Sequence, residues 1–115
     1  EHVTGWDTNI FVAVLSRFQS KVAFINFVQD VTQSCDCVAP SGFPVVPDIG
    51  ILASTDVVAI DKASLDLIAQ SKPLGKFADI SSPDILGKIN GTDSLIHIRT
   101  AHELGLGNTK YELRE

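Results

Sequence analysis

The sequence predicts an α/β or α+β layer fold, in which about four helices pack on a small, mainly buried sheet of three to four strands. Two short segments, 22–28 and 49–54, are rich in β-branched and other apolar residues, as strands are. The remaining segments show helical spacing or helix caps, in the order helix, two strands, three helices and a last strand. Because this makes a small sheet, we expect part of it to come from chain outside the sequence.

The first half of the chain is expected to hold one helix and the two apolar strands. Residues 8–19 have apolar side chains at the spacing of one helical face, and Asp7 or Thr8 can cap the start. The segment VAFINFV, 22–28, is apolar on both alternating faces, as a strand covered on two sides is. Residues 31–48 contain three prolines and therefore form an unusually long, ordered connection to the strand at 49–54.

The second half is expected to be mostly helical. A helix runs to about Gln70, with Ser54 or Thr55 as its N-cap and Asp56 in its first turn. A short helix within SSPDILGKING starts from Ser82 as cap and stops at 90–91, and a further one lies within SLIHIRTAHELGLG. The tail KYELRE alternates apolar and charged residues as an edge strand does.

Length and charge limit the class of protein. With 115 residues the chain is the size of one domain, 1–115, which we interpret as the C-terminal portion of a longer protein. The net charge of −5 and the lack of a basic stripe argue against nucleic acid and anionic membrane surfaces as partners. No apolar run approaches the roughly 20 residues that span a bilayer. Two cysteines are too few for a disulfide scaffold, and this indicates the cytoplasm.

Cys35 and Cys37 are the candidate metal ligands. In an extended segment their side chains would point to opposite sides, so joint use demands a turn, and a disulfide in so small a ring would be strained. Two thiolates can hold a soft metal or one edge of an iron–sulfur cluster, but a closed site normally needs four ligands. His97 and His102 lie about 140° apart around a helix and cannot chelate together. Partly buried thiols, metal contact and a redox pair all stay open, and a complete site requires a symmetry partner or further chain.

Two aspartates and a helix start are the other candidates. Asp48 precedes the second strand and Asp56 follows it, up to roughly 26 Å away, which is too far for a catalytic carboxylate pair. For Asp56, capping and compensation of the helix dipole are favoured over catalysis. Ser54 and Thr55 lead into a helix whose N–H groups could hold an anion, but every capped helix has such an end.

Four segments carry a family resemblance. FINF, CDC, PDIGILAS with the following VAID, and LGLGNTKYEL resemble the C-terminal part of the domain of unknown function 362 family, most clearly over 23–68 and 104–114. The resemblance implies a cytoplasmic prokaryotic protein of a few hundred residues, often with a ferredoxin-type segment that carries two 4Fe–4S clusters. Its Cys-Asp-Cys turn and following strand correspond here to Cys35, Asp36, Cys37 and 47–50. A Cys-x-x-Cys-x-x-Cys run is absent from this sequence, so that cluster cannot be carried over to it.

Two functions from different classes follow. In the first, Cys35 and Cys37 contact an iron–sulfur cluster or another soft metal in a redox protein, with Asp48 or Asp56 nearby. In the second, the chain is a non-catalytic interaction domain that packs against a missing N-terminal segment, a ferredoxin-type domain or a second copy in a homodimer. An anion-binding enzyme at 54–56 is a third option.

Overall fold

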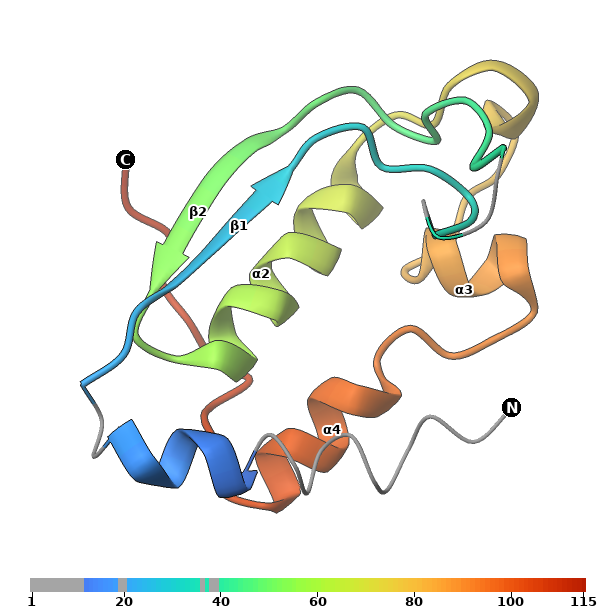
Figure 1. Cartoon of the computed structure of the whole chain (residues 1–115). Helices are drawn as coiled ribbons and strands as arrows, with labels where there is room; N and C mark the ends of the chain where they lie inside the picture. Colours follow the sequence, from blue (N-terminus) through green and yellow to red (C-terminus); the bar gives the residue numbers. More distant parts are fainter. Residues whose placement is uncertain (1–11, 19–20, 36, 38–39) are drawn as a thin grey trace.

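The computed structural model describes residues 12–18, 21–35, 37 and 40–115 (Figure 1). Helix and strand are mixed, as predicted. Residues 12–15 are helical, and the elements that follow are η1 (Ser16–Phe18), β1 (Phe24–Val28), β2 (Gly50–Ser54), α2 (Val57–Gln70), η2 (Gly75–Phe77), α3 (Ile85–Asn90) and α4 (Ile96–Glu103). None of the helices in the described ranges is long and apolar enough to cross a bilayer.

The two strands form one antiparallel ladder. Phe24 pairs with Ser54 at one end and Val28 with Gly50 at the other. The long connection between them is held in place by its own backbone: Thr32 bridges Pro44, and the N–H of Val45 donates to the carbonyl of Val31 at 2.7 Å. The two described ends of this connection, 31–35 and 40–48, therefore lie side by side.

The core lies between the inner face of this ladder and α2. Val45 and Val46 are fully buried, although they belong to the loop. They pack with Val28 from β1 and Ile68 from α2 in one cluster that also includes Phe77 and Ile85. Burial of these side chains anchors the loop, because each apolar side chain removed from water contributes roughly 1.5–3 kcal/mol.

The outer face of the ladder is open, contrary to the prediction that β1 is covered on both sides. Ile25, Phe27 and Ile51 are 60%, 65% and 61% exposed, and Ala53 beside them is also exposed. The side chains alternate along each strand, and α2 packs only against the opposite face, that of Asn26 and Val28 (Figure 1). We call these four residues, Ile25, Phe27, Ile51 and Ala53, the outer face.

The helix caps are shifted from the predicted residues. Asp56, and not Ser54 or Thr55, is the N-cap of α2, and Asp84, and not Ser82, is the N-cap of α3. In both places the aspartate carboxylate accepts from the N–H three residues later, as a cap does. The serine two residues earlier accepts instead from the aspartate's own N–H, at 2.9 Å in α2 and 3.1 Å in α3. The predicted stop at Gly91 is confirmed, since its φ of 64° is left-handed.

The predicted edge strand in the tail is wrong, so the sheet of the described chain has two strands, where three to four were expected. The tail is attached to α2 instead. The N–H of Asn108 donates to Asp56 Oδ2, and the hydroxyl of Tyr111 donates to Asp66 Oδ2, both at 2.8 Å. These bonds lead the tail along the helix, where its backbone does not pair with β2. Of the predicted first helix, residues 12–18 are helical, while 8–11 and 19 lie outside the described residues.

Candidate functional site

The cysteine loop contains the turn that joint use of the two thiols requires. The N–H of Cys37 donates to Cys35 Sγ at 3.4 Å, which places the first side chain against the second residue. No disulfide joins them, and both cysteines are exposed, whereas partial burial was one of the expectations. The loop therefore presents two thiols together at the surface.

Contact with Cys35 affects the protonation of Cys37. A hydrogen bond to the Cys35 side chain raises the pKa of the Cys37 thiol, and desolvation and the charge of Cys35 act in the same direction. The protonated thiol is therefore favoured when nothing is bound, which is unlike the lowered pKa of a cysteine nucleophile.

A hollow of about 500 Å³ lies beside Cys35. Hydroxyl and amide side chains dominate its walls, and Asp30 supplies the one acidic group among the residues that line it: Gln29, Asp30, Thr32, Gln33, Ser34, Cys35, Ser41, Leu86 and Asn90. Asn90 in α3 holds the loop by donating from Nδ2 to the carbonyl of Gln33 at 3.1 Å. The thiol at this hollow thus has mostly neutral surroundings.

Asp48 lies at the same end of the ladder as the cysteine loop, as expected for antiparallel strands. Its Oδ1 accepts from the N–H of Asp30 at 2.9 Å, and Asp30 has a left-handed φ of 46°. The carboxylate of Asp48 thereby stabilises a conformation that few residues other than glycine adopt. Nevertheless, among the described residues no group of three or more His, Cys, Asp or Glu side chains could hold a metal ion.

Asp56 lies at the opposite end, and both of its oxygens are engaged. Oδ1 accepts from the N–H of Ala59 and Oδ2 from the N–H of Asn108, at 2.9 and 2.8 Å. Ser54 Oγ accepts from the N–H of Asp56 itself. A carboxylate of this chain therefore already occupies the helix start at which 54–55 were candidates for binding an anion.

A polar cluster between three elements was missed by the sequence analysis. Asn26 on β1 donates from Nδ2 to Asp61 Oδ1 at 2.9 Å and to Ser64 Oγ at 3.0 Å, both on α2. His97 on α4 lies 3.6 Å from Asp61, measured from Nε2 to Oδ2. Burial raises the pKa of Asp61, but the hydrogen bonds from His97 and Asn26 outweigh it and leave this pKa lowered. An asparagine inside an apolar strand was the available signal.

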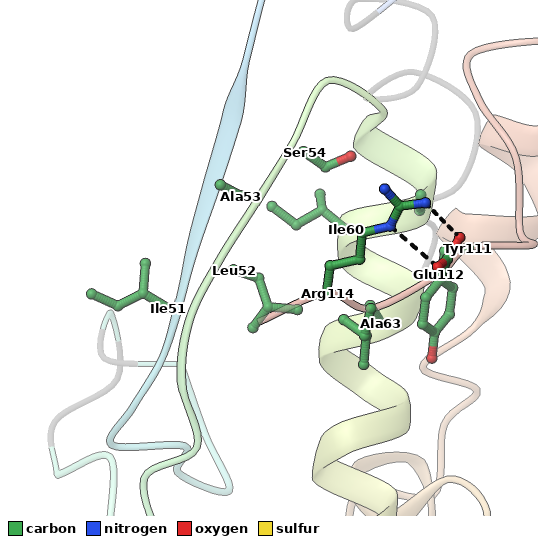
Figure 2. A pocket seen from close by; sticks show the side chains of 11 residues that line it. Ile51, Leu52, Ala53, Ser54, Ile60, Ala63, Tyr111, Glu112 and Arg114 are labelled. Carbon is green, nitrogen blue, oxygen red and sulfur yellow. Dashed lines mark hydrogen bonds and ion pairs between the residues drawn. The ribbon is translucent and has the colours of Figure 1, made fainter.

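A second hollow, of about 300 Å³, separates the tail from β2 and α2 (Figure 2). Ala59 and Ala63 leave space on the helix because their side chains are short. Figure 2 shows the side chain of Arg114 in front of α2, beside Ile60, with its guanidinium bonded to Glu112. Nδ1 of His102 lies 2.8 Å from the carbonyl of Gly107, within the segment that leads into the tail.

Comparison with known proteins gives one family. A family described as Domain of unknown function (DUF362) matches residues 2–66, more than half of the chain. The matched range includes both strands and the cysteine loop and ends inside α2, whereas the tail lies beyond it. Neither the curated proteins nor the solved structures gave a match. The length of the family match, over the strands and the loop that form the site, shows that this chain belongs to the domain of unknown function 362 family.

Proposed function

We propose that this chain is an interaction domain that completes a longer protein, with the outer face as the surface on which the rest of that protein packs. The observation that carries the proposal is the exposure of Ile25, Phe27 and Ile51, each at least 60% exposed. Phe27 and Ile51 are directly paired across the strands, so they form one continuous apolar surface. Since α2 covers only the inner face of the ladder, further apolar chain on the outer face would add stability by removing these side chains from water.

The size of the outer face decides which occupant we propose. Two strands of five residues cover on the order of 170 Å². A stable complex between separate chains buries about 800 Å² on each partner, several times more. A segment of the same polypeptide needs far less area, because covalent linkage gives it a millimolar effective concentration. We therefore propose that strands or helices of a longer protein, with residues 1–115 as its C-terminal portion, cover this face, in preference to a second copy or a separate ferredoxin-type domain.

Charge supports the same choice. The outer face has no charged side chain, although the chain as a whole carries a net charge of −5. An apolar segment can cover such a surface without desolvating an ionised group, which is costly.

Cysteine labelling tests this proposal. In a background of Cys35→Ser and Cys37→Ser, Phe27→Cys probes the outer face, and Leu104→Cys, at a residue that is 47% exposed, is the matched control. Both thiols should react with a maleimide at similar rates in residues 1–115. In the full-length gene product the thiol at 27 should react at least about tenfold more slowly, while the control is unchanged. Equal rates in the full-length product would refute the proposal, and protection that grows with the concentration of residues 1–115 would indicate a second copy.

A second function is favoured by the thiol pair. We propose that Cys35 and Cys37 contribute two ligands to a soft metal or an iron–sulfur cluster in a redox protein. The N–H of Cys37 bonded to Cys35 Sγ supports this, because it holds both residues in one turn. The proposal suits a reducing compartment such as the cytoplasm, where exposed thiols persist. No acid–base role is proposed for Asp48 or Asp56, since the hydrogen bonds that they accept stabilise the backbone.

Metal analysis tests the second function. The protein is purified without oxygen, and its metal content is compared with that of Cys35→Ser and Cys37→Ser. Loss of bound metal in both variants is the expected result, because each removes one of two sulfur ligands. The same metal content in all three proteins would reject it.

A further inference from the structure

The cysteine turn carries an inference about the kind of ion it binds, which rests on the soft-metal function proposed above. We propose that Cys35 and Cys37 by themselves bind one monovalent thiophilic ion of coordination number two, with Cu(I) as the biological example. The two thiols lie in one turn, and both are accessible from solvent. Such an ion needs only two sulfur ligands in opposition, whereas zinc and iron–sulfur clusters need about four.

The number of ligands is the first argument. Within the described ranges no third His, Cys, Asp or Glu side chain joins the two cysteines in a group able to hold a metal. An ion that prefers four ligands therefore depends on ligands from outside the described ranges to complete its shell. A two-coordinate ion is fully coordinated by this loop alone.

The chemistry of the surroundings is the second argument. Thiolates select soft ions, whereas carboxylates and carbonyls suit magnesium, calcium and manganese. The hollow at Cys35 is lined mainly by neutral hydroxyl and amide groups, with Asp30 as its one acidic residue. A hard divalent ion would find only one carboxylate among the residues that line this hollow, whereas a soft ion has two sulfur ligands in the turn.

Binding is a simple exchange of ions. Each thiol releases one proton to solvent, two sulfur–metal bonds form, and the ion and two thiolates together carry one negative charge. The ion enters and leaves in its monovalent state, so no oxidant or reductant takes part. The N–H of Cys37 points at Cys35 Sγ and can continue to donate to it as a thiolate.

The turn should also make binding tighter than two cysteines in an unfolded segment. Thr32 Oγ1 donates to the carbonyl of Ser34 at 2.8 Å, and Asn90 ties the carbonyl of Gln33 to α3. These bonds order the backbone just before Cys35. An ordered site avoids part of the conformational entropy that a flexible peptide loses on binding.

Anaerobic competition against a chromogenic Cu(I) chelator tests the inference. Residues 1–115 should bind one equivalent of Cu(I), and Cys35→Ser and Cys37→Ser should each bind at least about 100-fold more weakly, which corresponds to nearly 3 kcal/mol. Ser34→Ala, which changes a neighbouring side chain without removing sulfur, should bind like the parent chain. A synthetic peptide of residues 31–41 should bind about tenfold more weakly than the folded chain.

The same titration with Zn(II) separates this inference from the function on which it rests. The inference is supported if Cu(I) binds with a 1:1 stoichiometry and Zn(II), in its own titration, binds at least about 100-fold more weakly. Tight binding of one Zn(II) by two chains overturns the inference. It would still agree with the soft-metal function, in which Cys35 and Cys37 supply two of four ligands. If the peptide equals the folded chain, the turn does not build the site and the inference fails. If neither ion binds to residues 1–115, the inference fails, and the soft-metal function is then judged by the metal content of the protein purified without oxygen.

Discussion

Asp56 joins the start of α2 to a segment 52 residues later in the chain, because its Oδ2 accepts from the backbone N–H of Asn108 at 2.8 Å. Its other oxygen caps the helix through the N–H of Ala59. One carboxylate therefore starts the central helix and fixes the path of the tail. The following predictions test this attachment and the other polar contacts that hold the fold together.

Removal of the Asp56 carboxylate should destabilise the fold through both contacts. Asp56→Ala loses the cap and the bond to Asn108, and this should lower the free energy of unfolding by about 2 kcal/mol. Asp56→Asn keeps one acceptor oxygen and should lose about half as much. Urea denaturation measures both, with Asp79→Asn at an exposed position as the control. Equal losses for the alanine and asparagine variants would contradict the double role.

A side chain at Gly107 should conflict with the same carboxylate. A Cβ built there would overlap Asp56 Oδ1, so Gly107→Ala forces the two segments apart and should cost about 1–3 kcal/mol. In the Asp56→Ala background the overlap is gone, and the cost should fall sharply. A double-mutant cycle measured by denaturation gives the coupling between the two positions. Additive losses would show that Gly107 matters for another reason.

Tyr111 should titrate late and make stability fall at high pH. Desolvation, and then the hydrogen bond to Asp66 and its charge, raise the pKa of Tyr111 from 10.0 to about 12. Because the folded pKa is the higher one, this contribution to stability is complete below pH 10 and is lost as the pH rises to about 12. It is the one tyrosine of the chain, so ultraviolet absorbance follows it directly.

Two variants check the origin of that shift. Tyr111→Phe should remove the extra loss of stability between pH 10 and 12 that the parent shows. Asp66→Asn should move the phenol midpoint back toward 10, since the carboxylate that accepts the hydrogen bond is gone. A parent midpoint near 10 in the folded chain would mean that the tail is not held on α2.

Asn26 should stabilise the ionised form of Asp61. Asn26→Ala removes a donor to this carboxylate, so the lowered pKa of Asp61 should rise toward 3.8, as followed by carboxyl carbon NMR. Because the pKa of Asp61 is lower in the folded chain, ionised Asp61 contributes stability above pH 3.8. This contribution is lost as the pH falls through the folded pKa. The free energy of unfolding of the variant should therefore be lower than that of the parent near neutral pH, by about 1–2 kcal/mol. On acidification the variant should lose less stability than the parent does.

The neighbouring outward residue provides the control for Asn26. Ile25 belongs to the same strand but points to the outer face and is 60% exposed. Ile25→Ala should leave the pKa of Asp61 unchanged and cost little stability, because surface substitutions usually change it by less than about 0.5 kcal/mol. A similar change in both variants would indicate a general effect on β1.

Local sequence patterns identified most helices and both strands of the ladder. The apolar spacing at 57–70 predicted α2, the left-handed Gly91 marked the end of α3, and the spacing of Asp48 and Asp56 already separated them. These features depend on neighbouring residues, and such neighbours are visible in a sequence. The cap residues were misassigned by one or two positions, because serine, threonine and aspartate can all cap a helix and only the backbone geometry chooses between them.

The sequence by itself determined the mixed class, the order of the central elements and the requirement for a turn between Cys35 and Cys37. Only the tertiary structure decided that the tail follows α2 and does not extend the sheet, because Asp56 and Asp66 capture it through contacts more than 40 residues apart. It also decided which side of β1 is covered. Alternation alone cannot tell whether an apolar row meets a helix or stays open, and the packing of α2 on one face left Phe27 and Ile51 on the other.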